Sequence, residues 1–293
     1  MIKREKYLKK IRGFYDNELI KIITGMRRCG KSILLKQIVE ELKEKGIDDE
    51  HIVFMNLEDI EYIELLNVKA LNNYIKSKIK DDKKYYLFFD EIQNVPEFEL
   101  VINSFRSTLN VSIFLTGSNG KLLSGELSTH LSGRYISFKM LPFSFAENCE
   151  VKNITNPTEK DLALYIEWGG MPQLNNINTN EEKKMFLQDL YNSIILKDII
   201  ERSDIKDVNL LNRIIQFLLE NIGGLFSANS IKNFLKQEMI NTSVDRLLNY
   251  IDNVTSSMLI NKVNRYDIRG KRVMSTQEKY YMADLRNNAI KKI

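Results

Sequence analysis

The sequence predicts an α/β fold with a parallel sheet, followed by an all-helical segment and then by two helices and a β-hairpin. Three observations lead to this prediction. In the first half, short β-branched apolar runs alternate with runs whose apolar residues recur at helical spacing, as in strands joined by crossover helices. From residue 144 to about residue 219 only the helical spacing continues. From residue 226 onward, two helical runs precede two runs typical of strands.

The elements of the first half follow in order. We expect strands at 18–25, 51–59, 83–92, 110–119 and 134–141, and helices at 31–46, 67–80, 96–109 and 120–134. Gly46 is a stop signal for the first of these helices, and Pro96 is expected to open the third. Such an alternation predicts a parallel sheet that is covered on both faces.

The second half is expected to be helical from residue 144, with one interruption at the Gly-Gly-Met-Pro stretch 169–172. Trp168, just before it, is expected to be a core aromatic residue. Two helices should follow at 227–239 and 240–260, the second capped by Thr242 or Ser243. The run 261–284 is then expected to form a hairpin with its turn at Asp267–Lys271, which gives a winged helix-turn-helix outline.

Composition excludes several classes of protein. The chain has 293 residues, enough for about two domains, and its 43% hydrophobic content is that of a globular protein. It has no apolar run of membrane-spanning length and no secretory signal pattern, so we expect a cytoplasmic protein with no membrane partner. Cys29 and Cys149 are too few for a disulfide framework, and His51 and His130 are too far apart to form a metal-ligand cluster.

The stretch TGMRRCGKS, residues 24–32, fits the pattern of a phosphate-binding loop, with Gly25, Gly30, Lys31 and Ser32 in the defining positions. It leaves an expected strand and opens an expected helix, which is the context that such a loop requires. Its glycines would let backbone N–H groups wrap an anion at the helix N-terminus. Lys31 would reach the β- and γ-phosphates and Ser32 would ligate Mg²⁺. The alternative is a basic turn at a strand–helix junction.

The nucleotide-binding residues expected from this loop are Gly25, Arg28, Cys29, Gly30, Lys31, Ser32 and Ile33. Arg27 and Arg28 fall at the tip of the loop, where either could touch phosphate or a neighbouring subunit or be a solvated charge. Tyr7 and Ile2, upstream of the first strand, could belong to an adenine pocket or to a packed N-terminal helix.

The run YYLFFDEIQ places two carboxylates where a buried strand ends. In open α/β sheets ligands bind beyond the carboxyl ends of the strands. Asp90 would hold Mg²⁺ directly or through water, and Glu91 would act as general base toward the attacking water. Alone, the pair could be a surface Asp-Glu that caps the next segment; beside a phosphate-binding loop it indicates hydrolysis.

Two further positions are candidates for catalysis. If the strand order is 5-1-4-3-2, the end of the fourth strand lies between the first and third, so Ser118 or Asn119 could bond the γ-phosphate or the lytic water, with Thr116 a weaker candidate. An ordinary strand-ending turn is the alternative. Arg134 could act as an arginine finger in the site of an adjacent protomer, which would imply an oligomer, or it could be a surface arginine.

These motifs together resemble those of predicted archaeal and bacterial AAA-superfamily ATPases, which are related to signal-transducing STAND NTPases and carry an uncharacterised C-terminal domain. The segments that carry the resemblance are IKREKYLKKI, ITGMRRCGKS, LFFDEIQNV, FLTGSNGKLLS, LSGRY, LPFSFAE, EWGGMPQ and KYYMADLRNN. The resemblance implies an additional-strand P-loop NTPase core with a five-stranded parallel sheet, an α-helical lid and a winged-helix domain. We expect these parts at 1–142, 143–205 and 206–293.

The chain departs from the family pattern at two points. Such proteins usually continue into a further α/β module with a nuclease-like outline, whereas this sequence stops at Ile293. In MADLRNN, the family more often has a glycine before Leu-Arg, which leaves the role of Arg286 open.

The sequence therefore predicts an ATP- and Mg²⁺-dependent ATP hydrolase whose turnover drives a conformational switch coupled to the winged helix. The alternative is an ATP-bound DNA-binding regulator or protein-interaction scaffold with little turnover, and kinase-like transfer is a third reading. The expected recognition helix is not strongly basic, but the wing is, so DNA phosphates could be tracked by Lys262, Arg265, Arg269, Lys271 and Arg272.

Overall fold

The computed structural model describes residues 2–117, 131–201, 203, 205–263 and 278–284. The chain forms two compact units, Met1–Met140 and Leu141–Ile293, each of which is described by itself. Among the helices that the structure describes, none combines the length and apolar content that a bilayer crossing needs.

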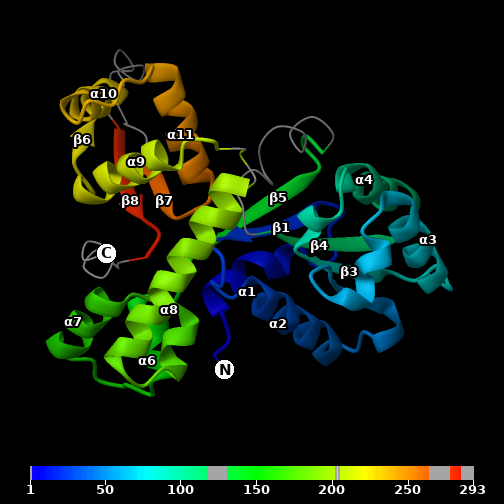
Figure 1. Ribbon diagram of the computed structural model, residues 1–293. Helices are drawn as coiled ribbons and strands as arrows, with labels where there is room; N and C mark the ends of the chain where they lie inside the picture. The colour runs from blue at the N-terminus through cyan, green and yellow to red at the C-terminus, as the bar shows by residue number, and fades with distance from the viewer. Residues whose placement is uncertain (1, 118–130, 202, 204, 264–277, 285–293) are drawn as a thin grey trace, which may run out of the picture. The chain divides into compact units, whose positions relative to one another are not determined.

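The first unit alternates strands and helices as the sequence predicts (Figure 1). Its strands are β1 (Ile20–Gly25), β2 (Ile52–Asn56), β3 (Tyr85–Asp90), β4 (Val111–Gly117) and β5 (Tyr135–Met140). Its α-helices are α1 (Glu5–Ile11), α2 (Lys31–Glu44), α3 (Val68–Lys78) and α4 (Phe98–Thr108). Short 3-10 helices are η1 (Arg12–Phe14), η2 (Asp49–His51), η3 (Ile60–Leu65) and η4 (Ile92–Asn94).

The described strands of this unit form one parallel sheet in the order β2-β3-β4-β1-β5. This confirms the predicted order, with β4 inserted between β1 and β3. The start of α4 differs from the prediction. Glu97 has a left-handed backbone (φ 54°), so the helix begins at Phe98 and Pro96 lies outside it. Most of the helix expected at 120–134 lies outside the described residues.

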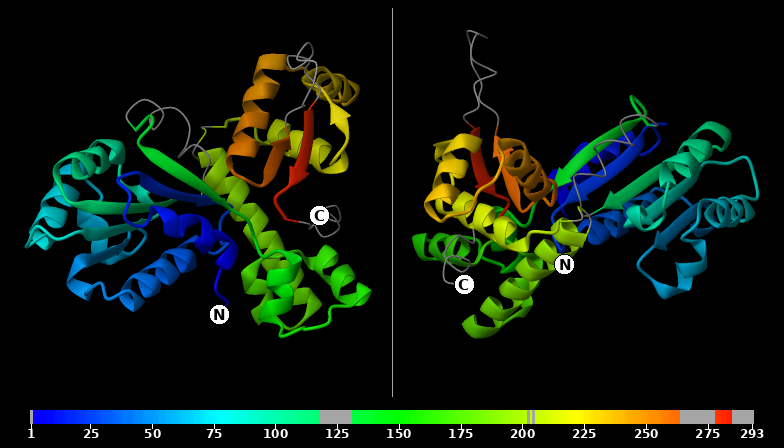
Figure 2. Two further views of the ribbon diagram at one scale, coloured as in Figure 1. Left: turned by 180° about the vertical axis from the view of Figure 1, so that it is seen from behind. Right: turned by 45° about the horizontal axis from the view of Figure 1, so that its top comes forward.

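The sheet is buried on both faces. On one face, α3 and α4 pack through Leu71, Ile75, Ile102 and Phe105 against alternate strand residues. On the other face, α1 and α2 supply Leu8, Ile11, Leu34, Leu35 and Ile38, which pack against Ile23, Phe88 and Phe114. Figure 2 shows the two helical layers from two further directions. Because strand side chains alternate between faces, Asp90 and Thr116 continue the α2 face beyond Phe88 and Phe114.

The second unit begins with helices. They are α6 (Phe145–Val151), α7 (Glu159–Trp168), the 3-10 helix η6 (Pro172–Asn176), α8 (Asn180–Ser193), the π-helix η7 (Ile194–Glu201) and α9 (Val208–Glu220). Ser144, Thr158 and Thr179 each form a capping box with an acidic residue three positions later, which fixes the starts of α6, α7 and α8.

The chain then continues through β6 (Leu225–Phe226), α10 (Ala228–Gln237), α11 (Val244–Ser256), β7 (Ile260–Val263) and β8 (Glu278–Met282). These strands form an antiparallel sheet in the order β6-β8-β7. Ser243 accepts a hydrogen bond from the Arg246 N–H and is the N-cap of α11. The turn predicted at Asp267–Lys271 lies outside the described residues.

The Gly-Gly interruption joins three distant segments of this unit. Trp168 is buried and ends α7, and the N–H of Phe143 donates to the Gly170 carbonyl at 2.7 Å. The Gly170 N–H donates in turn to Oδ1 of the buried Asp284 at 2.7 Å. The end of β8 is therefore fixed to the segment that precedes α6.

Candidate nucleotide-binding site

The loop between β1 and α2 is shaped by its two glycines. Gly30 has φ +105°, a conformation that L side chains rarely adopt, and it is the N-cap of α2. A Cβ atom at Gly25 would lie closer than 3.0 Å to both the Met140 carbonyl oxygen and the Cys29 Sγ. Gly25 is therefore required because β5 runs directly against the loop. These two constraints wrap the loop around the start of α2.

Lys31 begins α2 and is almost fully buried, with 4% of its surface exposed. Its Nζ donates to the Gly25 carbonyl oxygen at 3.3 Å and lies 3.5 Å from Oε1 of Glu91. A buried ammonium needs compensating negative charge. The structure thus brings together the loop lysine and the acidic pair at the end of β3, as expected for two motifs that follow the carboxyl ends of strands in one parallel sheet.

Asp90 ends β3 and is buried, with 4% of its surface exposed. The strand register places it one position beyond the pair Phe89 and Leu115, so it lies beside Thr116 of β4. The Thr116 hydroxyl donates to Oδ1 of Asp90, and the Ser32 side chain also hydrogen-bonds Asp90. The two expected Mg²⁺ ligands, Ser32 and Asp90, are therefore in contact.

Burial raises the pKa of Asp90, and this effect outweighs the hydrogen bonds from Ser32 and Thr116, which lower it. The neighbouring Glu91 charge raises the pKa further, while the charge of Lys31 lowers it. An aspartate whose ionised form is disfavoured by its surroundings would be stabilised by a bound cation. The electrostatics of Asp90 therefore fit a metal ligand.

Glu91 occupies a left-handed backbone conformation, with φ 54° and ψ 52°. Its N–H donates to Thr116 Oγ1 at 2.9 Å, and its carboxylate accepts a hydrogen bond from the Gln93 side chain. A non-glycine residue with positive φ costs free energy and persists only where its surroundings hold it. The conformation directs the Glu91 carboxylate toward Lys31.

Gln93 Oε1, a buried oxygen atom near this site, lacks a hydrogen-bond partner among the described residues. Gln93 is the residue whose side-chain amide donates to Glu91. Buried polar groups are normally satisfied, so this oxygen could accept a hydrogen bond from a ligand. The glycine-lined loop and the buried Lys31 fit a triphosphate with a hard cation. In the described residues no three His, Cys, Asp or Glu side chains converge on a metal site.

The other loop residues are placed as follows. Arg27 lies 3.7 Å from the Glu58 carboxylate, and Arg28 is exposed with φ 62°. The Cys29 N–H donates to the Met26 carbonyl, its thiol faces the Met140 carbonyl, and burial raises the pKa of that thiol. Ile33 is half-buried in the first turn of α2. Ser118 and Asn119 lie outside the described residues.

Arg134 is exposed and donates to Oδ1 of Asn103 at 2.9 Å. Its carbonyl accepts the Ile20 N–H, so it lies at the amino end of β1, whereas the loop follows the carboxyl end of that strand. The amino and carboxyl ends of β1 lie at opposite ends of the parallel strands. Arg134 therefore does not face the nucleotide site of its own chain.

Among the residues that contact the site, Thr116 is only weakly indicated by the sequence patterns, and Gln93 and Arg4 are not indicated by them. Thr116 bridges Asp90 and Glu91 through its hydroxyl, and its period-two spacing from Phe114 is the signal that places it on this face. The Gln93 side chain hydrogen-bonds Glu91, and no pattern in the sequence predicts this contact. Arg4 donates to the Cys29 carbonyl from 25 residues away, and nothing local in the sequence indicates that contact.

Comparisons with known proteins agree with this geometry. Residues 17–149 match an AAA domain, and residues 159–285 match a domain of unknown function. An uncharacterised protein of Haemophilus influenzae is 38% identical over 299 residues, covering 100% of this chain and 74% of the relative. The uncharacterised protein MJ1544 of Methanocaldococcus jannaschii is 30% identical over 277 residues, covering 90% of this chain and 60% of the relative.

Among solved structures, the Walker-type ATPase PABY2304 of Pyrococcus abyssi has the same fold, with a TM-score of 0.67 at 16% identity, covering 100% of this chain and 96% of that chain. Most of the first unit thus matches an AAA domain, and the chain shares the fold of a Walker-type ATPase. The chain belongs to the same family as the Haemophilus influenzae protein.

Proposed function

We propose that this chain binds ATP with Mg²⁺ through the first unit and hydrolyses it. The observation that carries the proposal is the convergence of Lys31, Ser32, Asp90 and Glu91 at the start of α2. A basic turn at a strand–helix junction would leave its lysine solvated, whereas Lys31 is buried against a carboxylate. This arrangement supports a P-loop site over the alternative of a surface turn.

Each residue has a distinct role in this proposal. The N–H groups at the start of α2 and the Lys31 ammonium would hold the β- and γ-phosphates. Ser32 and Asp90 would hold Mg²⁺, which when bound would draw charge from the phosphate oxygens. Thr116 would hold Asp90 and Glu91 in place, because its hydroxyl donates a hydrogen bond to Asp90 and accepts one from the Glu91 N–H.

The 3.5 Å contact between Lys31 and Glu91 suggests how binding prepares hydrolysis. Phosphate oxygens would compete with Glu91 for the Lys31 ammonium. Glu91 would then accept a proton from water as the water oxygen attacks the γ-phosphorus and the bond to the β-phosphate oxygen breaks. Ser118 or Asn119 would hydrogen-bond that water or the γ-phosphate, and Arg134 would act in the site of a second copy of the chain.

We further propose that residues 143–205 form a lid and residues 206–293 a winged-helix domain that responds to turnover. The element order α9-β6-α10-α11-β7-β8 and the sheet order β6-β8-β7 support a winged helix. ATP binding and hydrolysis would switch the conformation of the second unit. The second unit is the part of the chain that would pass this change to a partner.

DNA is the second candidate for that partner, through the basic wing. The described surface of α11 exposes Asp245, Arg246 and Asp252, and Lys262 of β7 pairs with Glu278 at 2.7 Å. The other wing residues, Arg265, Arg269, Lys271 and Arg272, lie outside the described residues. DNA binding would be tested by a salt titration with duplex and single-stranded DNA. Affinity that does not fall as salt rises would exclude phosphate tracking.

The proposed hydrolysis is tested by two substitutions in the site. Lys31→Ala should weaken ATP binding about 100-fold or more, because it removes a buried cation from the phosphates. Glu91→Gln should retain ATP binding and lower turnover by about 10²–10⁴-fold, because the general base is lost.

Lys36→Ala, an exposed lysine on the same helix, is the matched control and should change neither ATP affinity nor turnover. Binding is measured with a fluorescent ATP analogue and turnover by phosphate release. Parent-rate hydrolysis by Glu91→Gln would exclude Glu91 as the base.

A further inference from the structure

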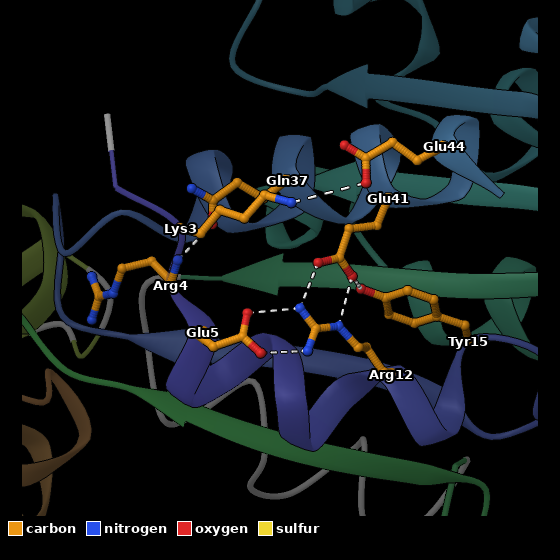
Figure 3. A network of polar contacts seen from close by, with 8 residues as sticks. All are labelled: Lys3, Arg4, Glu5, Arg12, Tyr15, Gln37, Glu41 and Glu44. Atoms are coloured by element: carbon orange, nitrogen blue, oxygen red, sulfur yellow. Dashed lines mark hydrogen bonds and ion pairs between the residues drawn. The ribbon is translucent and has the colours of Figure 1, made fainter.

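Arg4 is the most deeply buried arginine of the described residues, with 2% of its surface exposed. The segment that carries it is tied to α2. The Arg4 N–H donates to Oε1 of Gln37 at 3.0 Å (Figure 3). Nε2 of Gln37 donates in turn to the Ile2 carbonyl at 2.7 Å. Tyr7, Leu8 and Ile11 of α1 then pack into the core on the α2 face. The N-terminal segment is thus held against the helix that the loop opens.

The Arg4 guanidinium reaches the loop itself. Its Nη1 donates to the Cys29 carbonyl oxygen at 3.2 Å and would lie 3.7 Å from a Cβ atom at Gly30. Its central carbon lies 5.0 Å from the centre of the Tyr7 ring, which braces the guanidinium from one side. Tyr7 therefore serves to hold Arg4 in this structure. A second buried cation accordingly lies beside the loop, in addition to Lys31.

An anion-binding loop must point its N–H groups inward, so its carbonyl oxygens need donors on the outside. The rigid, permanently charged fork of arginine is suited to holding such a carbonyl in one orientation. The Cys29 carbonyl that Arg4 holds and the Gly30 N–H belong to the same peptide group. Fixing the carbonyl therefore fixes the direction of the Gly30 N–H, because the two groups share one peptide plane.

We infer that Arg4 is a positioning residue of the nucleotide site. It sets the orientation of the Cys29–Gly30 peptide and adds positive charge behind the loop, which would favour ligands that carry more phosphate groups. The inference rests on the proposed function for its ligand. Its geometric part concerns the loop alone and can be measured without nucleotide.

Arg12 provides a matched control within the same N-terminal segment (Figure 3). It pairs with Glu5 and with Glu41 of α2, and Glu41 also accepts a hydrogen bond from Tyr15 at 2.8 Å. Figure 3 shows the Arg4 guanidinium pointing away from this cluster. Arg12 therefore holds the same segment to the same helix without contacting the loop through these bonds.

The first measurement is amide hydrogen exchange of the full chain without nucleotide. The Cys29 and Leu34 amides donate to the Met26 and Gly30 carbonyls and report on the folded loop. Arg4→Met should raise their exchange rates about tenfold or more, since a charge-assisted hydrogen bond to the loop is lost. Arg12→Met should lower global stability and leave the exchange of these two amides, relative to other core amides, unchanged.

The second measurement compares ATP, ADP and AMP affinities of the same variants. Arg4→Met should weaken ATP binding about tenfold and AMP binding less, so the preference for ATP over AMP falls. Arg12→Met should keep the parent preference. Arg4→Lys, which retains the charge but not the fork, should fall between the parent and Arg4→Met.

Equal effects of Arg4→Met and Arg12→Met on loop exchange and on the ATP preference would overturn the inference and leave Arg4 a structural residue. If Arg4→Met does not fold, the comparison is made between Arg4→Lys and Arg12→Lys, and equal behaviour again overturns it. A parent chain that binds no ATP would refute the proposed function, while the exchange experiment would still decide whether Arg4 positions the loop.

Discussion

Two glycine-containing turns of this chain lie beside carboxylate side chains, and the carboxylates have different roles in the two turns. The loop with Gly25 and Gly30 ends at the buried Lys31 and faces Asp90 and Glu91. The turn at Gly169 and Gly170 is closed by Asp284, whose Oδ1 accepts the Gly170 N–H at 2.7 Å. A Cβ atom at Gly169 would lie 2.5 Å from that oxygen. Both turns require glycine because another group approaches the backbone closely.

The difference between the turns lies in what completes them. Asp284, 114 residues away in the sequence, fills the Gly169–Gly170 turn from within the same chain. Beside the Gly25–Gly30 loop, the buried Gln93 Oε1 instead lacks a hydrogen-bond partner among the described residues. A glycine turn that the chain itself completes is a structural joint, whereas one that it leaves incomplete is a candidate ligand site.

The largest effect is expected at the joint. A Cβ atom at Gly170 would lie closer than 3.0 Å to the backbone of Phe143, which cannot move as a side-chain end would. Gly170→Ala should therefore lower the free energy of unfolding by about 3 kcal/mol or more. The control is Gly13→Ala, since nothing lies within 4 Å of that position, and it should be neutral or slightly stabilising. Urea unfolding measures both, and equal stability of the two variants would refute the close packing.

Two of the buried aspartates, Asp284 and Asp90, should respond to the same substitution with opposite signs. Asp284→Asn weakens a charge-assisted hydrogen bond and should lower the free energy of unfolding by about 1–2 kcal/mol. Asp90→Asn should raise it, by more than the ~0.5 kcal/mol scatter of neutral substitutions, when no nucleotide or Mg²⁺ is present.

The sign for Asp90 follows from its raised pKa. Between the unfolded and folded pKa values the native state holds a proton that the unfolded state has lost, so stability falls as pH rises through this window. Above it the full cost of ionised Asp90 remains, and the asparagine variant does not bear that cost. Urea unfolding at neutral pH with a chelator compares the variants with the parent. Destabilisation by Asp90→Asn would show that Asp90 is satisfied without a cation.

The last expected effect is a change of stability with pH, at the other end of β1, where a second buried lysine, Lys21, lies. Lys21 is fully buried and donates to the Asn17 carbonyl at 3.0 Å and to the Ser112 hydroxyl at 2.6 Å. Burial lowers the pKa of Lys21 to about 7. The unfolded chain then binds more protons above pH 7, so stability should increase with pH there, by at most about 1.4 kcal/mol per pH unit.

Lys21→Met should remove this increase, and the exposed Lys36→Met should preserve it. Thermal or urea unfolding between pH 6 and pH 9 measures the difference between variant and parent. A constant difference across that range would show that Lys21 keeps its proton in the folded chain.

Much of the first unit follows from local patterns in the sequence. The alternation of strand and helix and the placement of Lys31 and Asp90 agree with the prediction, because residue spacing determines which face and which end of an element a side chain occupies. The strand order assumed for the sheet also agrees, although no local pattern determines it. The predicted start of α4 was two residues too early, because Glu97, with its left-handed backbone, comes between Pro96 and the helix. No local signal distinguishes that turn from a helix opened by proline.

The sequence by itself determined where the phosphate-binding loop lies and which acidic residues end the neighbouring strand, since both depend on contiguous residues. Only the tertiary structure decided that Arg4 holds the loop from outside, that Asp284 completes the Gly169–Gly170 turn and that Arg134 lies at the opposite edge of the sheet. The physical reason is that these contacts join residues far apart in the chain. Strand register and helix packing bring such residues together, and no short sequence window contains both partners.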